Sequence, residues 1–175
     1  MSALSFRRAT VEDAQAITNL INSAYRGETS RQGWTTEADL LEGLRTTPQE
    51  IKQLISACDS FLLLCHRGAE LAGSVHVEKQ GKQAYIGMFV VRPDIQGAGI
   101  GKQLLEEAET LAQKAWEVNS YVMVVITFRH ELIAFYERRG YRRTGQLSEF
   151  PVNPALWIPK VRGLKMELME KLRGE

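Results

Sequence analysis

The sequence has little cysteine, almost no net charge and no long apolar run, and each shortage excludes a class of protein. Its two cysteines, Cys58 and Cys65, form neither a CxxC nor a CxxH pattern and are too few to cross-link a disulfide scaffold. These counts favour a reducing, cytoplasmic location, and we expect no metal site.

The charge balance and the apolar pattern exclude two kinds of partner. Lysine and arginine number 22 and aspartate and glutamate 21, so the formal net charge of +1 provides no overall field to attract a nucleic acid. No apolar run reaches the ~18 residues of a membrane span. The charged residues Arg7, Arg8, Glu12 and Asp13 stand where a signal peptide would be apolar. We therefore expect neither a nucleic-acid nor a membrane partner.

The length of 175 residues, 44% of them hydrophobic, predicts a single domain over residues 1–175 with one core. Periodicity and turn residues predict strands and helices in alternation. A capping box at Thr10 and Asp13 opens the first helix, and Thr36 is a candidate cap for a helix carrying Leu40, Leu41 and Leu44. The other expected helices are 48–57, a segment after the glycine-rich turn that runs through Ala115, and 131–139; the expected strands are 5–9, 61–66, 71–78, 83–91, 121–127, 141–146 and 164–169.

A glycine-rich turn, Gln96 to Lys102, joins an expected strand directly to an expected helix. Backbone N–H groups and the positive helix end converge on an anion in such a turn. The spacing does not fit a Walker loop, because Gln96 stands where its first glycine belongs and Gln103 where its Ser or Thr belongs. A dinucleotide fingerprint would need its third glycine at residue 102. An anion site is favoured over a turn that only allows tight packing.

Two sequence blocks resemble one known family. Residues 88–105 resemble the acetyl-CoA-binding segment of the GNAT superfamily of N-acetyltransferases, whose signature falls on Gln96, Gly99 and Gly101. Residues 129–141 resemble the helix that follows in that family, with Phe135-Tyr136 and Gly140-Tyr141 in register. The resemblance implies an α/β (α+β) fold with a mixed, mostly antiparallel central sheet and helices on both faces.

The resemblance also implies the site. Acetyl-CoA would be the co-substrate, with its pantetheine arm beside a splayed strand and an oxyanion held by a backbone N–H near Phe89 or Val90. Tyr136 would be the general acid that protonates the departing thiolate. The implied cofactor-binding residues are Phe89, Val90, Val91, Gln96, Gly97, Ala98, Gly99, Ile100, Gly101 and Lys102.

The predicted function is transfer of an acetyl group from acetyl-CoA to a primary amine, with a small molecule as acceptor. Two alternatives stay open: a catalytically inactive CoA-binding module that serves as a sensor or scaffold, and an enzyme that uses a longer acyl-CoA. Members of the family often dimerise through their late strands, so the resemblance also allows a homodimer.

The resemblance implies an acceptor pocket lined by the first helices and a late loop, for which the segments 25–37 and 150–157 are the candidates; the alternative is that Trp34 and Trp157 cover the edge of the core and the charges are solvated. Glu28 or Glu37 would meet an ammonium and Arg26 or Arg31 a carboxylate, which favours a small zwitterionic acceptor. Further candidates are Trp34 as a pocket wall; Glu28, Glu37, His76, Glu78 or a water chain as general base; and Arg129 as a partner of a phosphate or carboxylate or as a solvated residue. Cys65 lies in an apolar run and is disfavoured as a nucleophile.

Overall fold

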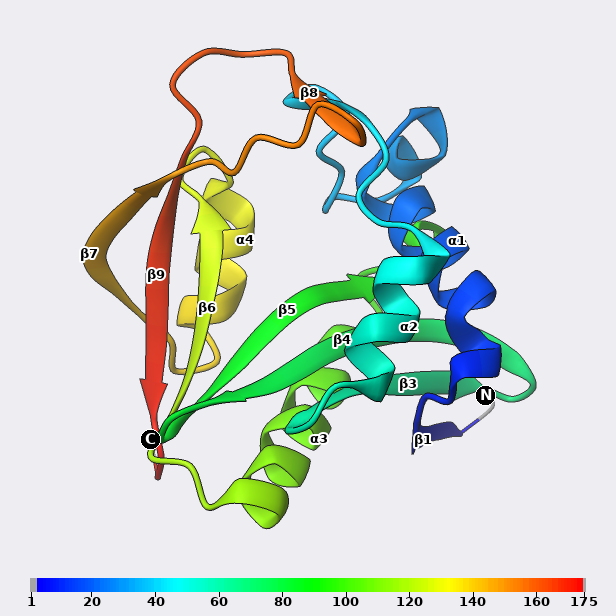
Figure 1. Ribbon diagram of the computed structural model, residues 1–175, viewed down its shortest axis with the longest axis vertical. Coiled ribbons are helices and arrows are strands. Elements are labelled where there is room, and N and C mark those ends of the chain that lie inside the picture. The colour runs from blue at the N-terminus through cyan, green and yellow to red at the C-terminus, as the bar shows by residue number, and fades with distance from the viewer. Residues whose placement is uncertain (1–2, 175) are drawn as a thin grey trace.

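The computed structural model describes residues 3–174, and within them seven strands form one sheet in the order β1-β3-β4-β5-β6-β9-β7 (Figure 1). Each neighbouring pair of this sheet in the described residues is antiparallel except β5 and β6. The strands are β1 Leu4–Arg8, β3 Ser60–Arg67, β4 Glu70–Gln80, β5 Gln83–Val91, β6 Ser120–Ile126, β7 Arg142–Glu149 and β9 Lys165–Leu172. A second, two-stranded sheet pairs β2 Leu41–Gly43 with β8 Trp157–Pro159.

Helices cover both faces of the large sheet, which confirms the predicted fold class. Leu62 and Leu64 of β3 pack in one core cluster with α1 Ala14–Tyr25 and α2 Pro48–Ser56. The intervening Leu63 and Cys65 pack in the other, with α3 Ile100–Trp116 and α4 His130–Glu137. Successive side chains of a strand point to opposite faces, so a strand covered on both faces is apolar throughout. The short 3-10 helices are η1 Val11–Asp13, η2 Glu28–Gln32 and η3 Pro93–Ile95.

Local signals placed several elements correctly. Thr47 caps α2, because its hydroxyl accepts a hydrogen bond from the backbone N–H of Glu50 at 3.3 Å, and Pro48 is the first helical residue as predicted.

None of the helices in the described part of the chain combines the length and the apolar character that crossing a membrane requires.

The predicted helix after Thr36 is wrong. Residues 38–40 form turns and Leu41 begins β2 instead. Leu41 is buried in a small cluster with Ile126 and Leu164, whereas Leu44 is 49% exposed, so the two leucines do not share a helix face. Pairing with β8 overrides the helical spacing, because the partner strand lies more than 100 residues away and its contribution is invisible locally.

β5 parts from β6 after three residues, as the resemblance implies. The two strands pair only over Gln83–Tyr85 and Ser120–Val122, and beyond that point they diverge (Figure 1). A bulge lies on this free part of β5: Val75 of β4 is opposed by both Met88 and Phe89, and Met88 has φ of 45°. The fold therefore leaves one edge of β5 open where the chain also bends.

Candidate active site

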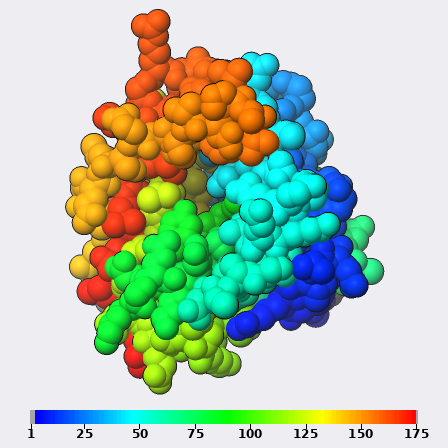
Figure 2. Space-filling view, in the orientation of Figure 1, coloured from blue at the N-terminus to red at the C-terminus, as the bar shows by residue number. Residues whose placement is uncertain are grey.

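Two cavities meet beside the free part of β5. The first, of about 310 Å³, is lined among others by Trp34, Gly97, Gly99, Gly101, Phe135 and Arg139 and is here called the glycine-turn cavity. The second, of about 130 Å³, is lined among others by Arg26, Glu37, Arg45, Arg129, Tyr136 and Trp157 and is called the arginine cavity. Phe89 and Leu132 line both. Figure 2 shows the surface hollowed where the orange late loop approaches the cyan segment before β3.

The backbone of the glycine-rich turn is open toward an incoming group. Gly97 and Gly99 have φ of 88° and 79°, and a Cβ built on either would meet nothing within 4 Å. The N–H groups of residues 97–99 have no acceptor within residues 3–174. The first N–H groups of α3 have none inside the helix by geometry. Free donors at a helix N-terminus fit an anionic group such as the pyrophosphate of CoA.

The Gln96 side chain is a cross-link rather than a free donor. Its Oε1 accepts from the Trp34 backbone N–H at 2.9 Å, and its Nε2 donates to Thr35 Oγ1 at 2.8 Å and to the Val91 carbonyl at 2.9 Å. Gln96 therefore ties the glycine-rich turn to the end of β5 and to the segment before β2. Its backbone N–H has no acceptor within residues 3–174.

The other residues predicted at the turn divide between core and surface. Ile100 is buried in the main core, and Ala98 is exposed. Lys102 lines the glycine-turn cavity with an exposed side chain whose ammonium lies 4.0 Å from Glu106. Sequence reasoning gave no role to two further cations of this cavity, Arg138 and Arg139. An arginine pair just before Gly140, within the matched block, was the available signal.

Arg139 is held against the cavity wall. Its guanidinium carbon lies 3.6 Å from the centre of the Phe135 ring, and its Nη1 donates to the Phe135 carbonyl at 2.7 Å. Burial, with the neighbouring charge of Arg138, lowers the pKa of Arg139, and its Nε is buried without a partner. Such a cation is suited to a phosphate.

The main chain of β5 is fixed where the resemblance places the pantetheine arm. The Tyr25 hydroxyl donates to the Phe89 carbonyl, and Gln96 holds the Val91 carbonyl. Val90 instead points its side chain into the cluster formed by α1 and α2. Of the three residues predicted from this strand, Phe89 and Val91 line the glycine-turn cavity and Val90 does not.

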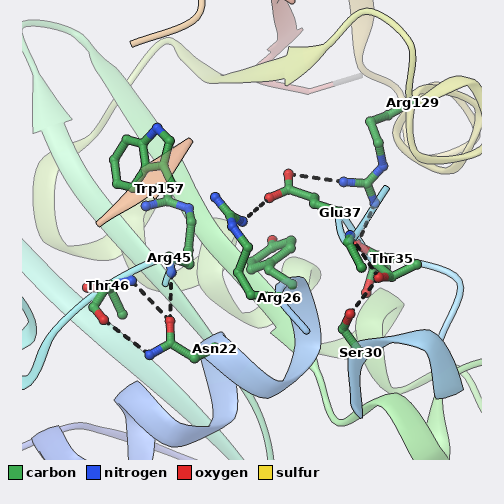
Figure 3. A network of polar contacts seen from close by, with 12 residues as sticks. Asn22, Arg26, Ser30, Thr35, Glu37, Arg45, Thr46, Arg129 and Trp157 are labelled. Carbon is green, nitrogen blue, oxygen red and sulfur yellow. Dashed lines mark hydrogen bonds and ion pairs between the residues drawn. The ribbon is translucent and has the colours of Figure 1, made fainter. Parts of the chain in front are cut away.

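Glu37 joins two arginines that are far from it in sequence (Figure 3). Its Oε1 accepts from Arg26 at the end of α1, and its Oε2 accepts from Arg129 before α4 at 3.1 Å. Arg129 also donates to the Thr35 carbonyl at 2.7 Å. Arg129, whose role the sequence left open, thus forms an internal ion pair with Glu37. Both oxygens of Glu37 are occupied by guanidinium groups.

The Tyr136 hydroxyl has no hydrogen-bond partner within residues 3–174, although the residue is only 5% exposed. Its ring packs edge-on against Phe135 and Tyr141. Tyr136 lines the arginine cavity, so its unpaired hydroxyl is available to a ligand there. Burial, and next the nearby Tyr25, raise the pKa of Tyr136 well above 10.0, which keeps the proton on the oxygen at neutral pH.

Several predicted residues lie outside both cavities. The Glu28 side chain is 89% exposed and pairs with Arg31 at 3.1 Å, and Arg31 also pairs with Asp39. His76 is buried against Ser60, and burial lowers its pKa to about 4. Glu78, the other strand candidate for a base, lines neither cavity. The structure brings Glu37 to the arginine cavity but not Glu28, His76 or Glu78.

The surroundings of Cys65 and Trp34 bear on the roles that the sequence analysis considered for them. Cys65 is buried in the main core, and burial raises the pKa of its thiol to about 11, so it is not a thiolate at neutral pH. Trp34 stands in the glycine-turn cavity, with its ring centre 5.7 Å from that of Phe135. It is therefore separated from the residues of the expected acceptor pocket.

Comparison with known proteins identifies the architecture. Residues 31–155, well over half of the chain, match the family model of the acetyltransferase (GNAT) domain. Blasticidin-S acetyltransferase from Streptomyces morookaense is 27% identical over 111 residues, which cover 63% of this chain and 79% of that protein.

Solved structures share the fold over almost the whole chain. The yncA protein of Salmonella typhimurium, determined with acetyl-CoA, superposes with a TM-score of 0.72 at 18% identity and covers 99% of this chain and 95% of its own. The ribosomal-protein-S18-alanine N-acetyltransferase of Escherichia coli gives a TM-score of 0.71 at 13% identity, with 97% and 94% covered.

Proposed function

We propose that this chain, which belongs to the GNAT family of acetyltransferases, acetylates a primary amine of a small molecule through direct attack of the amine on acetyl-CoA. The chain is an acetyl-CoA-dependent N-acetyltransferase. The observation that carries the proposal is the meeting of two cavities at Phe89 and Leu132, one with free backbone donors and one with a free tyrosine hydroxyl. Donor and acceptor would enter by separate openings and meet beside β5.

The glycine-turn cavity suits the donor. The backbone N–H groups of residues 97–101 would hold the pyrophosphate, and Lys102, Arg138 and Arg139 supply positive charge nearby. When bound, acetyl-CoA supplies a thioester whose carbonyl carbon is open to attack by an amine. A backbone N–H at the β5 bulge, near Phe89 or Val90, would stabilise the oxyanion that forms.

Tyr136 would complete the proton balance. As the amine nitrogen bonds to the acetyl carbon and the C–S bond breaks, its hydroxyl would protonate the departing sulfur. The attacking ammonium must first lose a proton. Glu37 gives both oxygens to arginines, and it is the one carboxylate among the described residues that line the arginine cavity. We propose that water accepts this proton, because both oxygens of this carboxylate already accept hydrogen bonds from guanidinium groups.

The size of the arginine cavity and the residues that line one side of it support a small acceptor. Phe150, Pro151 and Trp157 of the late loop line it on one side, and β8, which begins at Trp157, pairs with β2. The relative from Streptomyces morookaense is named for acetylation of blasticidin S, which also favours an acceptor that is not a protein.

The proposal is tested by incubating the protein with acetyl-CoA and pooled primary amines and following free thiol together with the mass of acetylated products. We expect thiol release that depends on the amine and matches the product formed. Thiol release at the same rate without any amine would mean hydrolysis, and the proposal would then be rejected.

Replacing Gly101 with valine should weaken acetyl-CoA binding at least about tenfold while the protein stays folded. Gly101 has ordinary helical φ, and a Cβ there would lie 3.4 Å from Phe135 and 3.5 Å from Phe89. The added methyl groups would therefore occupy the glycine-turn cavity and displace the ligand. A loss of about 1.4 kcal/mol of binding free energy corresponds to a tenfold weaker affinity. Calorimetric titration with CoA measures the effect. Gly101→Ala, which adds only the Cβ, should bind nearly as the wild type does; equal affinity for the valine variant would place the cofactor elsewhere.

Trp34→Ala should weaken acetyl-CoA binding about 2- to 10-fold and leave the acceptor KM nearly unchanged. The indole lies on Phe135 in the glycine-turn cavity, and such an aromatic pair contributes ~0.5–1.5 kcal/mol beyond its buried area. Trp157→Ala is the matched control in the arginine cavity and should show the reverse pattern. A rise in acceptor KM alone for Trp34→Ala would return Trp34 to the acceptor pocket.

A further inference from the structure

The arginine cavity carries more positive charge than it balances. Among the described residues that line it, the three arginines Arg26, Arg45 and Arg129 face one carboxylate, Glu37. Glu37 pairs with Arg26 and Arg129. The side chain of Arg45 has no hydrogen bond or ion pair within residues 3–174. Arg45 is partly buried, so desolvation penalises its charge in proportion unless a counter-charge lies nearby.

The fold holds Arg45 in place by its backbone (Figure 3). Asn22 of α1 accepts at Oδ1 from the N–H groups of Arg45 and Thr46, at 2.8 and 3.1 Å, and its Nδ2 donates to the Thr46 carbonyl at 3.1 Å. These three bonds attach the segment before α2 to a buried helix. Arg45 is therefore presented from a rigid support, as a binding residue needs to be.

Arg26 and Arg45 converge on one space. In Figure 3 the Arg45 guanidinium lies beneath Trp157, and the Arg26 guanidinium lies to its side, next to Glu37; both residues line the arginine cavity. Burial lowers the pKa of Arg26, and although Glu37 opposes this, the positive charge of Arg45 acts in the same direction as burial. The Nε of Arg26 is also buried without a partner. An anionic group between the two would relieve the repulsion and accept bonds that nothing in the described residues accepts.

We propose that Arg45, together with Arg26, binds a carboxylate of the acceptor, so that the substrate is an amine that also carries a carboxylate, such as an amino acid or its derivative. This inference rests on the proposed function. It replaces the earlier assignment of the carboxylate to Arg26 or Arg31, because Arg31 lies outside the cavity. A guanidinium matches a carboxylate in a bidentate geometry. A polyamine would instead add like charge to the cavity, and like charges repel most strongly in a desolvated site.

The test uses matched acceptors. Each of the standard amino acids is compared with its decarboxylated amine and its amide, and spermidine serves as the polycation. We expect acetylation of one or more amino acids with kcat/KM at least about tenfold above the matched amine and amide, because a charged hydrogen-bonded pair is worth about that much. Amines and amides acetylated as well as the amino acids, or spermidine as the best acceptor, would overturn the inference and leave the proposed function intact. If no amine is acetylated at all, both fall.

A variant then assigns the effect to Arg45. Arg45→Gln should raise the KM for the amino acid about 10- to 100-fold, abolish its advantage over the decarboxylated amine and leave acetyl-CoA affinity unchanged. Arg45→Lys should restore part of the loss, because it keeps the charge without the planar fork. Arg31→Gln is the control, since Arg31 is an exposed arginine with its own carboxylate partners. Wild-type preference for the carboxylate in Arg45→Gln would remove Arg45 from the acceptor site.

Discussion

Tyr136→Phe is expected to lower kcat about 10²- to 10⁴-fold, the usual contribution of a positioned general acid, with acetyl-CoA affinity nearly unchanged. The change removes one hydroxyl that makes no hydrogen bond within residues 3–174, so the packing of the ring on Phe135 and Tyr141 is kept. The loss would therefore appear in the chemical step. It should be measured as single-turnover acetyl transfer, so that product release does not mask it.

The pH dependence tests the raised pKa of Tyr136. Because the pKa of Tyr136 is raised well above 10.0, the proton stays on its oxygen as the pH rises from 7 toward 10. Wild-type kcat should therefore not fall in that range through loss of this proton. If the rate of the wild type fell between pH 7 and pH 10 and the rate of Tyr136→Phe did not, the pKa of Tyr136 would not be raised.

Two tyrosines serve as comparisons. Tyr85 also lines the arginine cavity, and burial raises its pKa as well, so Tyr85→Phe tests the other available acid. Tyr141→Phe instead removes a hydrogen bond of 2.8 Å to the buried Glu109 and should cost about 1 kcal/mol of stability with little effect on kcat. If Tyr85→Phe showed the large loss and Tyr136→Phe did not, the acid would be Tyr85.

The parts of the site that sequence could predict are those that depend on neighbours in the chain. The turn from Gln96 to Gly101 needs glycine at Gly97 and Gly99 because both have positive φ, and this requirement is visible as spacing. Helix α2 was predictable because its cap and first residue, Thr47 and Pro48, are adjacent. In these cases the physical cause and the sequence signal occupy the same few residues.

The arginine cavity could not be predicted in the same way. Glu37 and Arg129 are 92 residues apart, and they meet beside the part of the sheet where β5 and β6 are no longer paired. From the sequence, Glu37 was a free carboxylate for an ammonium, and Arg45 had no signal at all. A charged residue in a polar loop is usually solvated, so only the three-dimensional contacts reveal which charges are paired.

The early segment shows the same limit in secondary structure. Leucines at helical spacing predicted a helix over Leu40, Leu41 and Leu44, but pairing with β8 makes the centre of this segment a strand. The exchange matters for the site, because pairing with β2 holds Trp157, the first residue of β8, near the segment that contributes Glu37, and both residues line the arginine cavity. An error in one short element therefore hid the geometry of the pocket.

Glu37→Leu is expected to lower the free energy of unfolding by about 3–5 kcal/mol, the usual cost of removing one partner of a buried ion pair. The Arg26, Glu37 and Arg129 side chains are 3%, 12% and 9% exposed, so water replaces little of the lost interaction. Two desolvated guanidinium groups would remain, with Arg45 nearby and no carboxylate among the described residues of the cavity. Repulsion among them should add to the loss.

Urea denaturation measures this effect, and Glu28→Leu is its control. Both variants lose one negative charge from a Glu–Arg pair, but Glu28 is 89% exposed, so its variant should change stability far less. The double variant Glu37→Leu, Arg129→Leu should be more stable than Glu37→Leu alone, because one of the two orphaned charges is replaced by apolar packing. If Glu37→Leu unfolded at the same urea concentration as Glu28→Leu, Glu37 would not be the residue that neutralises the arginines. The excess positive charge of the arginine cavity, from which the carboxylate-bearing acceptor is inferred, would then no longer be established.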